Sequence, residues 1–296
     1  MNITHTFSIA ELTFKTIFDS HEKDILQFMF SLFPFRADPN KKKPLFQLTV
    51  TRHVQLIPQT CCERIRIFDS GDSRVTVDHF QNGGYQYTIK DTCNQPYCLL
   101  QTDKDFTNCK CTLNGCREMQ VRGLNNALMF CFAFAGSRHK TLLIHASLIR
   151  NQGYGYAFIA KSGTGKSTHT ALWLNHIKGC DLMNDDNPVI RIIEGQPYIF
   201  GSPWSGKTPC YRNVKARLGA ITHIERAKSN KIQKLPTSEA FGTLLSSCST
   251  MKWDKDIYDD TCDTIGNIIQ SINIYNLRCL PDQEAALTAY QTIRKA

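Results

Sequence analysis

The amino-acid sequence predicts an α/β domain in its C-terminal half, preceded by a mainly antiparallel β domain of the α+β kind. Before residue 121, short β-type segments are separated by turn residues. From residue 122 onward, strand-like and helix-like segments alternate, which is typical of α/β domains. In that half, an apolar run over residues 154–159 leads into a glycine-bearing loop and a helical pattern over residues 168–178. We therefore predict two domains, residues 1–121 and residues 122–296.

The glycine-bearing loop has the composition of a phosphate-binding site. Its glycines let consecutive backbone N–H groups turn inward, and the helix that follows adds unpaired N–H groups and the positive end of its dipole. Lys166 would reach the β- and γ-phosphates of a nucleotide, and the Ser167 hydroxyl would bind Mg²⁺. Ala160 stands where phosphate-binding loops usually have their first glycine. Its methyl group is small enough that we do not expect it to disable the loop. The predicted nucleotide-binding residues are Ser162, Gly163, Thr164, Gly165, Lys166, Ser167 and Thr168.

The composition indicates a soluble globular protein, with 42% hydrophobic and 21% charged residues among 296. No basic segment followed by an apolar block opens the chain, and the apolar run at residues 127–136 is too short for a membrane span. The net charge is +9, but the one sustained basic run, residues 41–43, has no interleaved aromatic residues. Thirteen cysteines in a chain of this size suggest buried, reduced thiols. We expect a cytoplasmic protein without nucleic-acid or membrane partners, and a homo-oligomer remains open.

Up to residue 134, two hairpins and two helices are predicted, and the second helix opens the C-terminal domain. Residues 73–80 and 85–90 flank a turn rich in Asn and Gly, and residues 109–113 and 116–121 flank Asn114-Gly115. Residues 21–33 place several apolar side chains on one helical face. Residues 124–134 are apolar on nearly every side, which suits a helix buried between two layers.

In the C-terminal half, strand and helix patterns surround the loop. The predicted strands are residues 141–149, 154–159, 181–184, 189–193, 198–200, 218–225 and 274–280. After the loop helix, further helices are expected from residue 236 through 245, around residues 265–269, and after the capping sequence at residues 281–284.

Two adjacent carboxylates, Asp185 and Asp186, follow the first strand after the loop helix. In a doubly wound sheet, that strand ends at the same crevice as the phosphate loop. Phosphoryl transfer needs a bound metal and a group that orients or deprotonates the acceptor. One Asp can help to hold Mg²⁺ while the other takes the acceptor proton. Ser167 and Asp186 are the predicted metal ligands, and the division of labour between the two carboxylates stays open.

His145 and Lys207 are the other predicted catalytic residues. His145 lies in the strand before the loop strand. A lone His in an apolar strand is commonly a core residue, and the functional alternative is contact with the carboxylate pair or a metal. Lys207 offers a cation for the transferring phosphate, as does Arg212.

Together, His145, the loop residues Ser162 to Ser167 and the pair Asp185-Asp186 resemble the kinase domain of HPr kinase/phosphorylase. That domain belongs to a P-loop group that includes phosphoenolpyruvate carboxykinase. Residues 202–207, 220–225 and 278–282 look like the corresponding parts of uncharacterised bacterial kinases related to HPr kinase. The resemblance covers roughly residues 141–296, and the N-terminal half does not resemble the N-terminal domain of HPr kinase.

The resemblance implies a P-loop kinase domain of the HPr kinase/carboxykinase type, with phosphorylation of a hydroxyl, typically of serine, by ATP and Mg²⁺. It also implies that Asp185 and Asp186 supply the general base and the metal contact, and that His145 tunes them. The acceptor can be a protein, a peptide or a small molecule such as free serine.

Other functions remain open at this point. A non-catalytic nucleotide-dependent binding protein would carry the same loop, and a carboxykinase-related enzyme would share the loop and the upstream His. A zinc module built from Cys93, Cys98, Cys109, Cys111 and Cys116 is a third reading. Zinc sites usually show closer paired spacing, so buried thiols in the core are the preferred interpretation of these cysteines.

Overall fold

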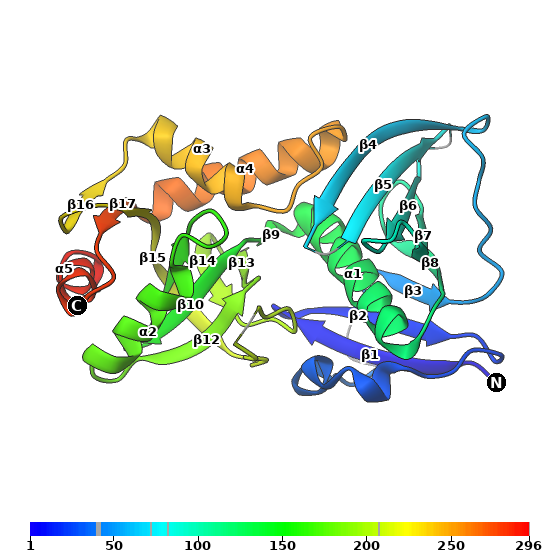
Figure 1. The fold of residues 1–296 in the computed structure, drawn as a ribbon, viewed down its shortest axis with the longest axis horizontal. Coiled ribbons are helices and arrows are strands. Elements are labelled where there is room, and N and C mark those ends of the chain that lie inside the picture. The colour runs from blue at the N-terminus through cyan, green and yellow to red at the C-terminus, as the bar shows by residue number, and fades with distance from the viewer. Residues whose placement is uncertain (40–42, 72, 82, 207, 296) are drawn as a thin grey trace. The chain divides into compact units, whose positions relative to one another are not determined.

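The computed structural model describes residues 1–39, 43–71, 73–81, 83–206 and 208–295. The chain divides into two compact units, Met1–Ala135 and Gly136–Ala296, whose elements are labelled in Figure 1. The predicted boundary at residues 121/122 falls inside helix α1 (Arg117–Gly136). The division comes later because α1 packs on the sheet of the first unit, where the rings of Phe130 and Phe134 contact Tyr87.

The first unit is a mainly antiparallel sheet with one long helix. Its strand order is β1-β2-β3-β8-β7-β6-β5-β4, and the β2–β3 and β3–β8 pairs are parallel. The strands are β1 (Ile3–Ile9), β2 (Leu12–Phe18), β3 (Gln47–Val50), β4 (Cys62–Ser70), β5 (Ser73–Phe80), β6 (Tyr85–Lys90), β7 (Pro96–Thr102) and β8 (Asn108–Leu113).

Two predicted elements of this unit are wrong. The expected helix at residues 21–33 is a pair of short 3-10 helices, η1 (Leu26–Phe28) and η2 (Phe30–Phe35). Its buried side chains recur every three residues, at Leu26, Met29, Leu32 and Phe35, which matches three residues per turn. The expected hairpin at residues 109–121 does not form because β8 already has a neighbour on each edge, β3 and β7. The residues after the turn enter α1 instead.

The second unit is a mixed α/β domain. Its strands are β9 (Thr141–Leu143), β10 (Ala146–Asn151), β11 (Tyr154–Ile159), β12 (Asp181–Asp186), β13 (Val189–Ile193), β14 (Gln196–Phe200), β15 (Lys215–Arg226), β16 (Lys231–Lys234) and β17 (Ile274–Cys279). Its helices are η3 (Ser137–His139), α2 (Lys166–His176), α3 (Thr237–Ser247), α4 (Lys255–Ser271) and α5 (Gln283–Ile293).

The sheet of this unit is mixed rather than doubly wound. The strand order is β12-β10-β11-β15-β14-β13-β9, and β17 joins β15 and carries β16. The β11–β15 and β15–β17 pairs are parallel, whereas β10 runs antiparallel to both of its neighbours. Strand β12 is therefore separated from β11 by β10, not adjacent to it. Because β10 opposes both strands, β11 and β12 still end at the same edge of the sheet.

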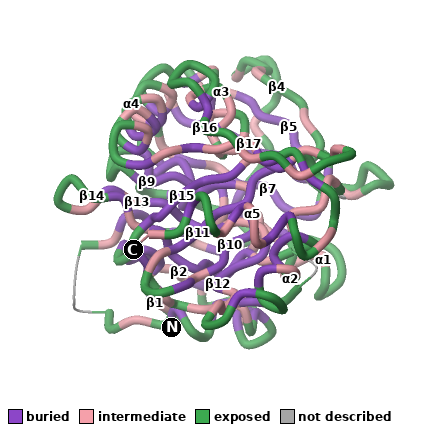
Figure 2. Tube along the Cα trace, turned by 90° about the vertical axis from the view of Figure 1, so that its left-hand side faces the viewer, coloured by how far each residue is buried: buried purple, intermediate pink, exposed green. Residues whose placement is uncertain are grey.

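Apolar cores lie on both faces of this sheet. On one face, Ile159, Ile221 and Ile274 pack with the buried sides of α3 and α4. On the other, Phe158 and Leu277 pack with α2 and α5. Figure 2 shows β10, β11 and β15 buried along much of their length. Two buried faces explain why these strands read as continuous apolar runs in the sequence.

The predicted continuous strand at residues 141–149 is also wrong, because it is two strands. β9 pairs with β13, and β10 pairs with β11 and β12. The two residues between them are held by the chain nearby, since Ile144 N–H donates to Pro188 O (3.1 Å) and His145 N–H donates to Ser247 O (2.7 Å). His145 therefore lies in a junction at the sheet edge rather than within a strand.

The structure describes all thirteen cysteines as free thiols. Cys98, Cys109 and Cys111 are buried in the first unit, whereas Cys93 and Cys116 are exposed. Within the described part of the chain, no three His, Cys, Asp or Glu side chains gather in a metal-binding arrangement.

Across the described residues, no helix combines the length and the apolar composition that crossing a membrane requires.

Burial of His169 makes the stability of this unit depend on pH. Burial on α2 lowers the pKa of His169 from 6.5 to about 4, and its Nε2 accepts a hydrogen bond from Trp173 Nε1–H (3.0 Å). The unfolded chain therefore binds the proton more readily than the folded chain. We expect the free energy of unfolding to fall as the pH decreases from about 6.5 to about 4, by up to about 3 kcal/mol.

Urea unfolding at pH 7 and pH 4.5 measures this effect. The variant His169→Gln keeps an acceptor for Trp173 and should lose the His169 share of the pH dependence. His176→Gln, at an exposed position of the same helix, is the matched control and should behave as the wild type. An identical pH dependence in the wild type and His169→Gln would contradict the assignment.

Candidate functional site

The glycine-bearing loop joins β11 to α2 and presents an open helix start. Gly163 and Gly165 have positive φ angles of 75° and 128°, which favour glycine over residues with a Cβ. Gly165 is the N-cap of α2 and provides no side-chain hydrogen bond to the first turn. Unpaired N–H groups and the helix dipole thus remain available to an anion.

Asp185 reaches the loop from the far side of β10. It is buried, with 5% of its surface exposed. In the β10–β12 ladder it lies directly opposite Ser147, and the Ser147 hydroxyl donates to Asp185 Oδ1. The Ser167 hydroxyl lies 3.1 Å from Oδ1 and 3.3 Å from Oδ2 of the same carboxylate. The first turn of α2 and the end of β12 are therefore connected through one carboxylate.

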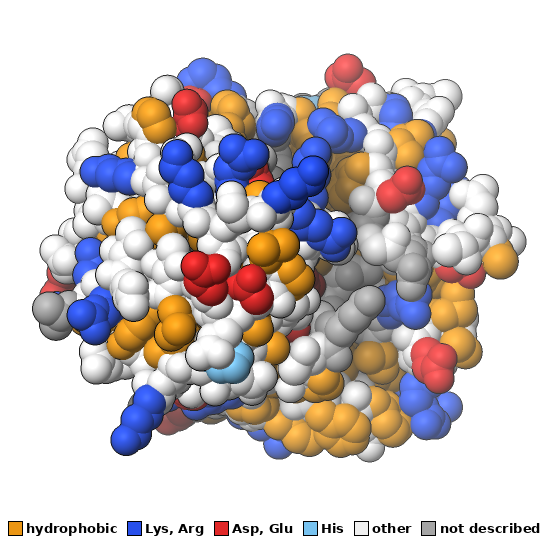
Figure 3. Space-filling model, turned by 60° about the vertical axis from the view of Figure 1, so that its left-hand side comes forward, with side chains coloured by type: hydrophobic (Ala, Val, Ile, Leu, Met, Phe, Trp, Pro, Cys, Tyr) orange, Lys and Arg blue, Asp and Glu red, His pale blue; other side chains and the backbone are white. Residues whose placement is uncertain are grey.

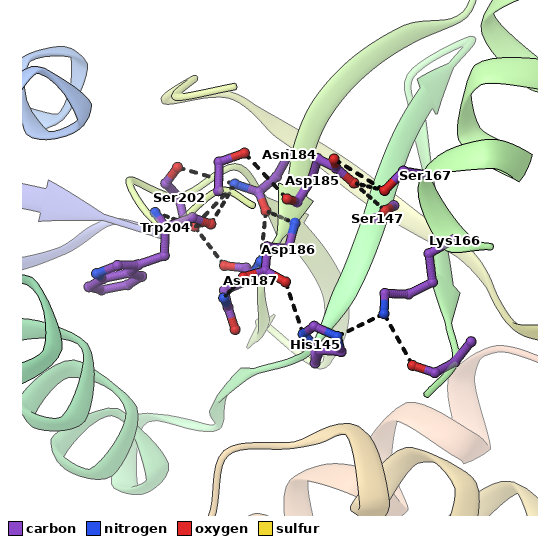
Figure 4. Close-up of polar contacts among 12 residues, drawn as sticks. His145, Ser147, Lys166, Ser167, Asn184, Asp185, Asp186, Asn187, Ser202 and Trp204 are labelled. Atoms are coloured by element: carbon purple, nitrogen blue, oxygen red, sulfur yellow. Dashed lines mark hydrogen bonds and ion pairs between the residues drawn. The ribbon is translucent and has the colours of Figure 1, made fainter. Parts of the chain in front are cut away.

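Lys166, His145 and Asp186 form a second chain of contacts at this edge (Figure 4). Lys166 Nζ donates to Ala160 O (3.1 Å) and lies 2.7 Å from His145 Nε2. His145 Nδ1 lies 3.0 Å from Asp186 Oδ1. An ammonium group can only donate, so Nε2 is the acceptor and the imidazole proton is on Nδ1, where it donates to Asp186. The histidine is thus oriented by a cation on one side and a carboxylate on the other.

The surroundings of Lys166 disfavour its charge. Burial lowers the pKa of the Lys166 ammonium, and the carboxylates of Asp186 and Asp185 partly offset this effect. An anion close to Nζ would stabilise the charged form further. The side chain is therefore placed to gain from a negatively charged ligand in the loop.

Asn184 organises the backbone around the two carboxylates. Its Oδ1 accepts from the N–H groups of Asp186 (3.2 Å) and Asn187 (3.0 Å). Its Nδ2 donates to Ser202 O (3.2 Å) and Trp204 O (3.2 Å), in the loop that follows β14. The side chain of Asn184 is fully buried. It therefore links the end of β12 to that loop at a place where water cannot replace its hydrogen bonds.

The loop after β14 lies tightly against β12. Ser205 forms an isolated bridge with Asp186, and Gly206 N–H donates to Asp185 O. A Cβ at Gly206 would lie 2.9 Å from Asp185 O, so the close approach requires glycine.

The predicted residues fall into three groups. Lys166, Ser167, Asp185, Asp186 and His145 lie together, as described above. Ser162, Gly163, Thr164, Gly165 and Thr168 lie in the loop and in the first turn of α2, where Ser162, Gly163 and Thr168 are exposed. Lys207 lies outside the described residues.

The predicted pairing of Ser167 with Asp186 as metal ligands differs from the geometry, because the carboxylate that contacts Ser167 is Asp185. Asp186 contacts His145 and accepts from Asn187 Nδ2 (2.7 Å). Arg212 lies away from the glycine-bearing loop. Its Nη1 donates to Asp181 Oδ2 (2.7 Å) at the beginning of β12, opposite the Asp185-Asp186 end.

Ser147 and Asn184 were not identified from the sequence. Both are polar residues inside apolar strand patterns, which is the one signal the sequence offers. Which group they contact depends on the partner strand and on the loop after β14, and the sequence does not specify either.

Neither a protein-family model nor a curated protein matches this sequence. Among solved structures, the HPr(Ser) kinase/phosphatase from Coxiella burnetii is similar over 50% of this chain and 86% of its own, at 12% identity and a TM-score of 0.28. The function proposed below therefore rests on the residues of the site.

Replacing Asn184 should destabilise the protein strongly. Asn184→Ala leaves several buried backbone groups without partners, and we expect the free energy of unfolding to fall by about 2–4 kcal/mol. Chemical denaturation measures the change, with Asn267→Ala on the exposed side of α4 as the matched control. Equal stability of the two variants would show that Asn184 does not link the two segments.

Proposed function

We propose that residues 136–296 form a kinase domain that transfers the γ-phosphoryl group of ATP, with Mg²⁺, to a hydroxyl group. The observation that carries the proposal is that both carboxylates are linked to the glycine-bearing loop by hydrogen bonds, one directly and one through His145. Asp185 is reached directly through Ser167, and Asp186 through His145 and Lys166. These are the groups that phosphoryl transfer uses to position phosphates, hold a metal and accept a proton.

The donor set fits Mg²⁺. Hard oxygen ligands suit this ion, and the Ser167 hydroxyl and the Asp185 carboxylate meet at the loop. The Asp185 carboxylate is buried and accepts from two neutral hydroxyls, Ser147 and Ser167, which favours a cation nearby. We assign Ser167 and Asp185, in place of Asp186, as the residues that hold the metal. When bound, Mg²⁺ supplies charge that stabilises the phosphates during transfer.

The remaining residues divide the other tasks. The N–H groups of the loop and of the first turn of α2 bind the phosphates, and Lys166 places its cation beside them. Asp186 accepts the proton of the acceptor hydroxyl while that oxygen bonds to the γ-phosphorus and the bond from this phosphorus to the β–γ bridging oxygen breaks. His145 holds Asp186 through the Nδ1–Oδ1 hydrogen bond. ADP carries away the electron pair of the broken bond.

A serine-bearing acceptor remains part of the proposal, and its size is open to a protein, a peptide or a small molecule. A screen of free serine, serine peptides and small proteins with labelled ATP and Mg²⁺ identifies the acceptor. ATP binding without transfer to any of them would favour a nucleotide-dependent binding protein over a kinase.

The variant Asp186→Asn should lose transfer while keeping nucleotide binding. Loss of a general base typically lowers the rate by about 10²–10⁴-fold, and the amide preserves the shape of the site. The measurements are transfer rate and ATP affinity, with Asp259→Asn at an exposed position of α4 as the matched control. Wild-type transfer by Asp186→Asn would rule out its role as base.

Asp185→Asn should act through the metal instead. We expect the Mg²⁺ concentration for half-maximal ATP binding to rise by about tenfold or more, because one charged metal ligand is lost. The same concentration should stay unchanged in Asp186→Asn. If the two variants exchange these behaviours, the original assignment of the metal to Asp186 is correct.

A further inference from the structure

Arg226 holds the outer side of the phosphate loop. It is the last residue of β15, which pairs in parallel with β11 so that His223 lies opposite Ile159, just before the loop. From this position Nε donates to Thr164 O (3.0 Å) and Nη2 donates to Gly163 O (2.6 Å). One guanidinium thus binds two consecutive carbonyl groups of the loop.

These two bonds fix the direction of the N–H groups on the other side. A trans peptide is planar, so the N–H of a residue points away from the carbonyl of the residue before it. Fixing Thr164 O therefore fixes the direction of Gly165 N–H, and fixing Gly163 O fixes Thr164 N–H. Thr164 N–H closes a turn on Lys161 O (3.2 Å), while Gly165 N–H is the first donor at the start of α2. Because Thr164 N–H is already bonded within the loop, Gly165 N–H is the donor of the two that an anion can use.

The bond from Thr164 N–H to Lys161 O also holds the Gly163–Thr164 peptide group, whereas the Thr164–Gly165 peptide group is held by Arg226. Gly163 and Gly165 have open space where a Cβ would be, and glycine peptides rotate more freely than those of other residues. Without a constraint, both orientations of the Thr164–Gly165 peptide are accessible. A fork-shaped guanidinium can hold two carbonyl groups at once, whereas a lysine ammonium has no such geometry.

We propose that Arg226 is a positioning residue that keeps the loop oriented for phosphate binding. This inference rests on the proposed function for the identity of the anion, but the orientation of the loop does not depend on it. Arg226 acts through the peptide groups of the loop and not by touching the reacting atoms. The ligand class is a polyphosphate, of which pyrophosphate is the simplest.

A general effect of positive charge is the alternative explanation. Lys231, Arg278 and Lys228 are exposed near the same ends of β15, β16 and β17. Figure 3 shows several Lys and Arg side chains in the upper part of the face turned toward the viewer, among hydrophobic, acidic and other side chains. Arg278 approaches Glu225 at 3.9 Å and is the matched control, because its removal takes away the same charge at this edge and leaves the two loop bonds intact.

The first test uses the protein without any ligand. In Arg226→Ala we expect hydrogen exchange of the Thr164 N–H to become about tenfold faster. The reason is that a charge-assisted hydrogen bond at an exposed site stabilises the closed loop by about that factor. Backbone ¹⁵N relaxation should show greater motion at Gly165. Arg226→Lys should fall between Arg226→Ala and the wild type, and Arg278→Ala should match the wild type. Unchanged loop amides in Arg226→Ala would overturn the proposal.

The second test measures binding of Mg²⁺-pyrophosphate by calorimetry. We expect the affinity to fall about tenfold in Arg226→Ala and to change little in Arg278→Ala. Equal losses in the two variants would assign the effect to charge and overturn the positioning role. If wild-type protein binds neither pyrophosphate nor ATP, the proposed function fails, and the amide measurements alone then decide the role of Arg226.

Discussion

The buried carboxylate of Asp185 is the contact on which the candidate site depends. It lies at the end of β12, yet it accepts hydrogen bonds from Ser147 on β10 and Ser167 on α2. Three elements from different parts of the chain are therefore fixed relative to one another at a single point. A buried charge is costly unless its neighbours stabilise it. Because the buried carboxylate needs neighbours that stabilise its charge, it holds three elements together and is also suited to bind a cation.

Strand β10, which lies between β11 and β12, gives the candidate site its geometry. Because β10 runs antiparallel to both β11 and β12, its first residues lie at the edge where those two strands end. The junction before β10 brings His145 to this edge, and the second residue of β10 is Ser147. A parallel strand in the same place would start at the opposite edge. The polar groups of the site therefore come from the antiparallel insertion as much as from the phosphate loop.

Gly206 and Asn184 both help to hold the loop after β14 against the end of β12. At Gly206 the absence of a Cβ lets one loop lie against Asp185 O, and Asn184 ties the same region to Ser202 and Trp204. Around the phosphate loop, Arg226 takes the corresponding role for the peptide groups of Gly163 and Thr164. At Asn184 and at Arg226, one side chain holds main-chain groups from two positions of the chain in a fixed direction.

The local elements follow from residues that are close together in the chain. The spacing of glycines and the apolar periods predicted the loop between β11 and α2, the Asp pair at the end of β12 and the Asp282 cap of α5. These features depend on φ and ψ preferences and on side chains only a few residues apart. The β1–β2 turn at Ala10 and Glu11, both at positive φ, was missed because neither residue signals a turn.

Which distant segments meet depends on the tertiary fold. It placed β10 between β11 and β12, divided residues 141–149 at His145, and gave β8 two neighbours, so that residues 117 onward form a helix. It also paired Ser167 with Asp185 instead of Asp186. Strand order and register are set by the packing of both sheet faces against helices from elsewhere in the chain. A one-residue change in register exchanges the faces of neighbouring side chains, and local sequence carries little information about that choice.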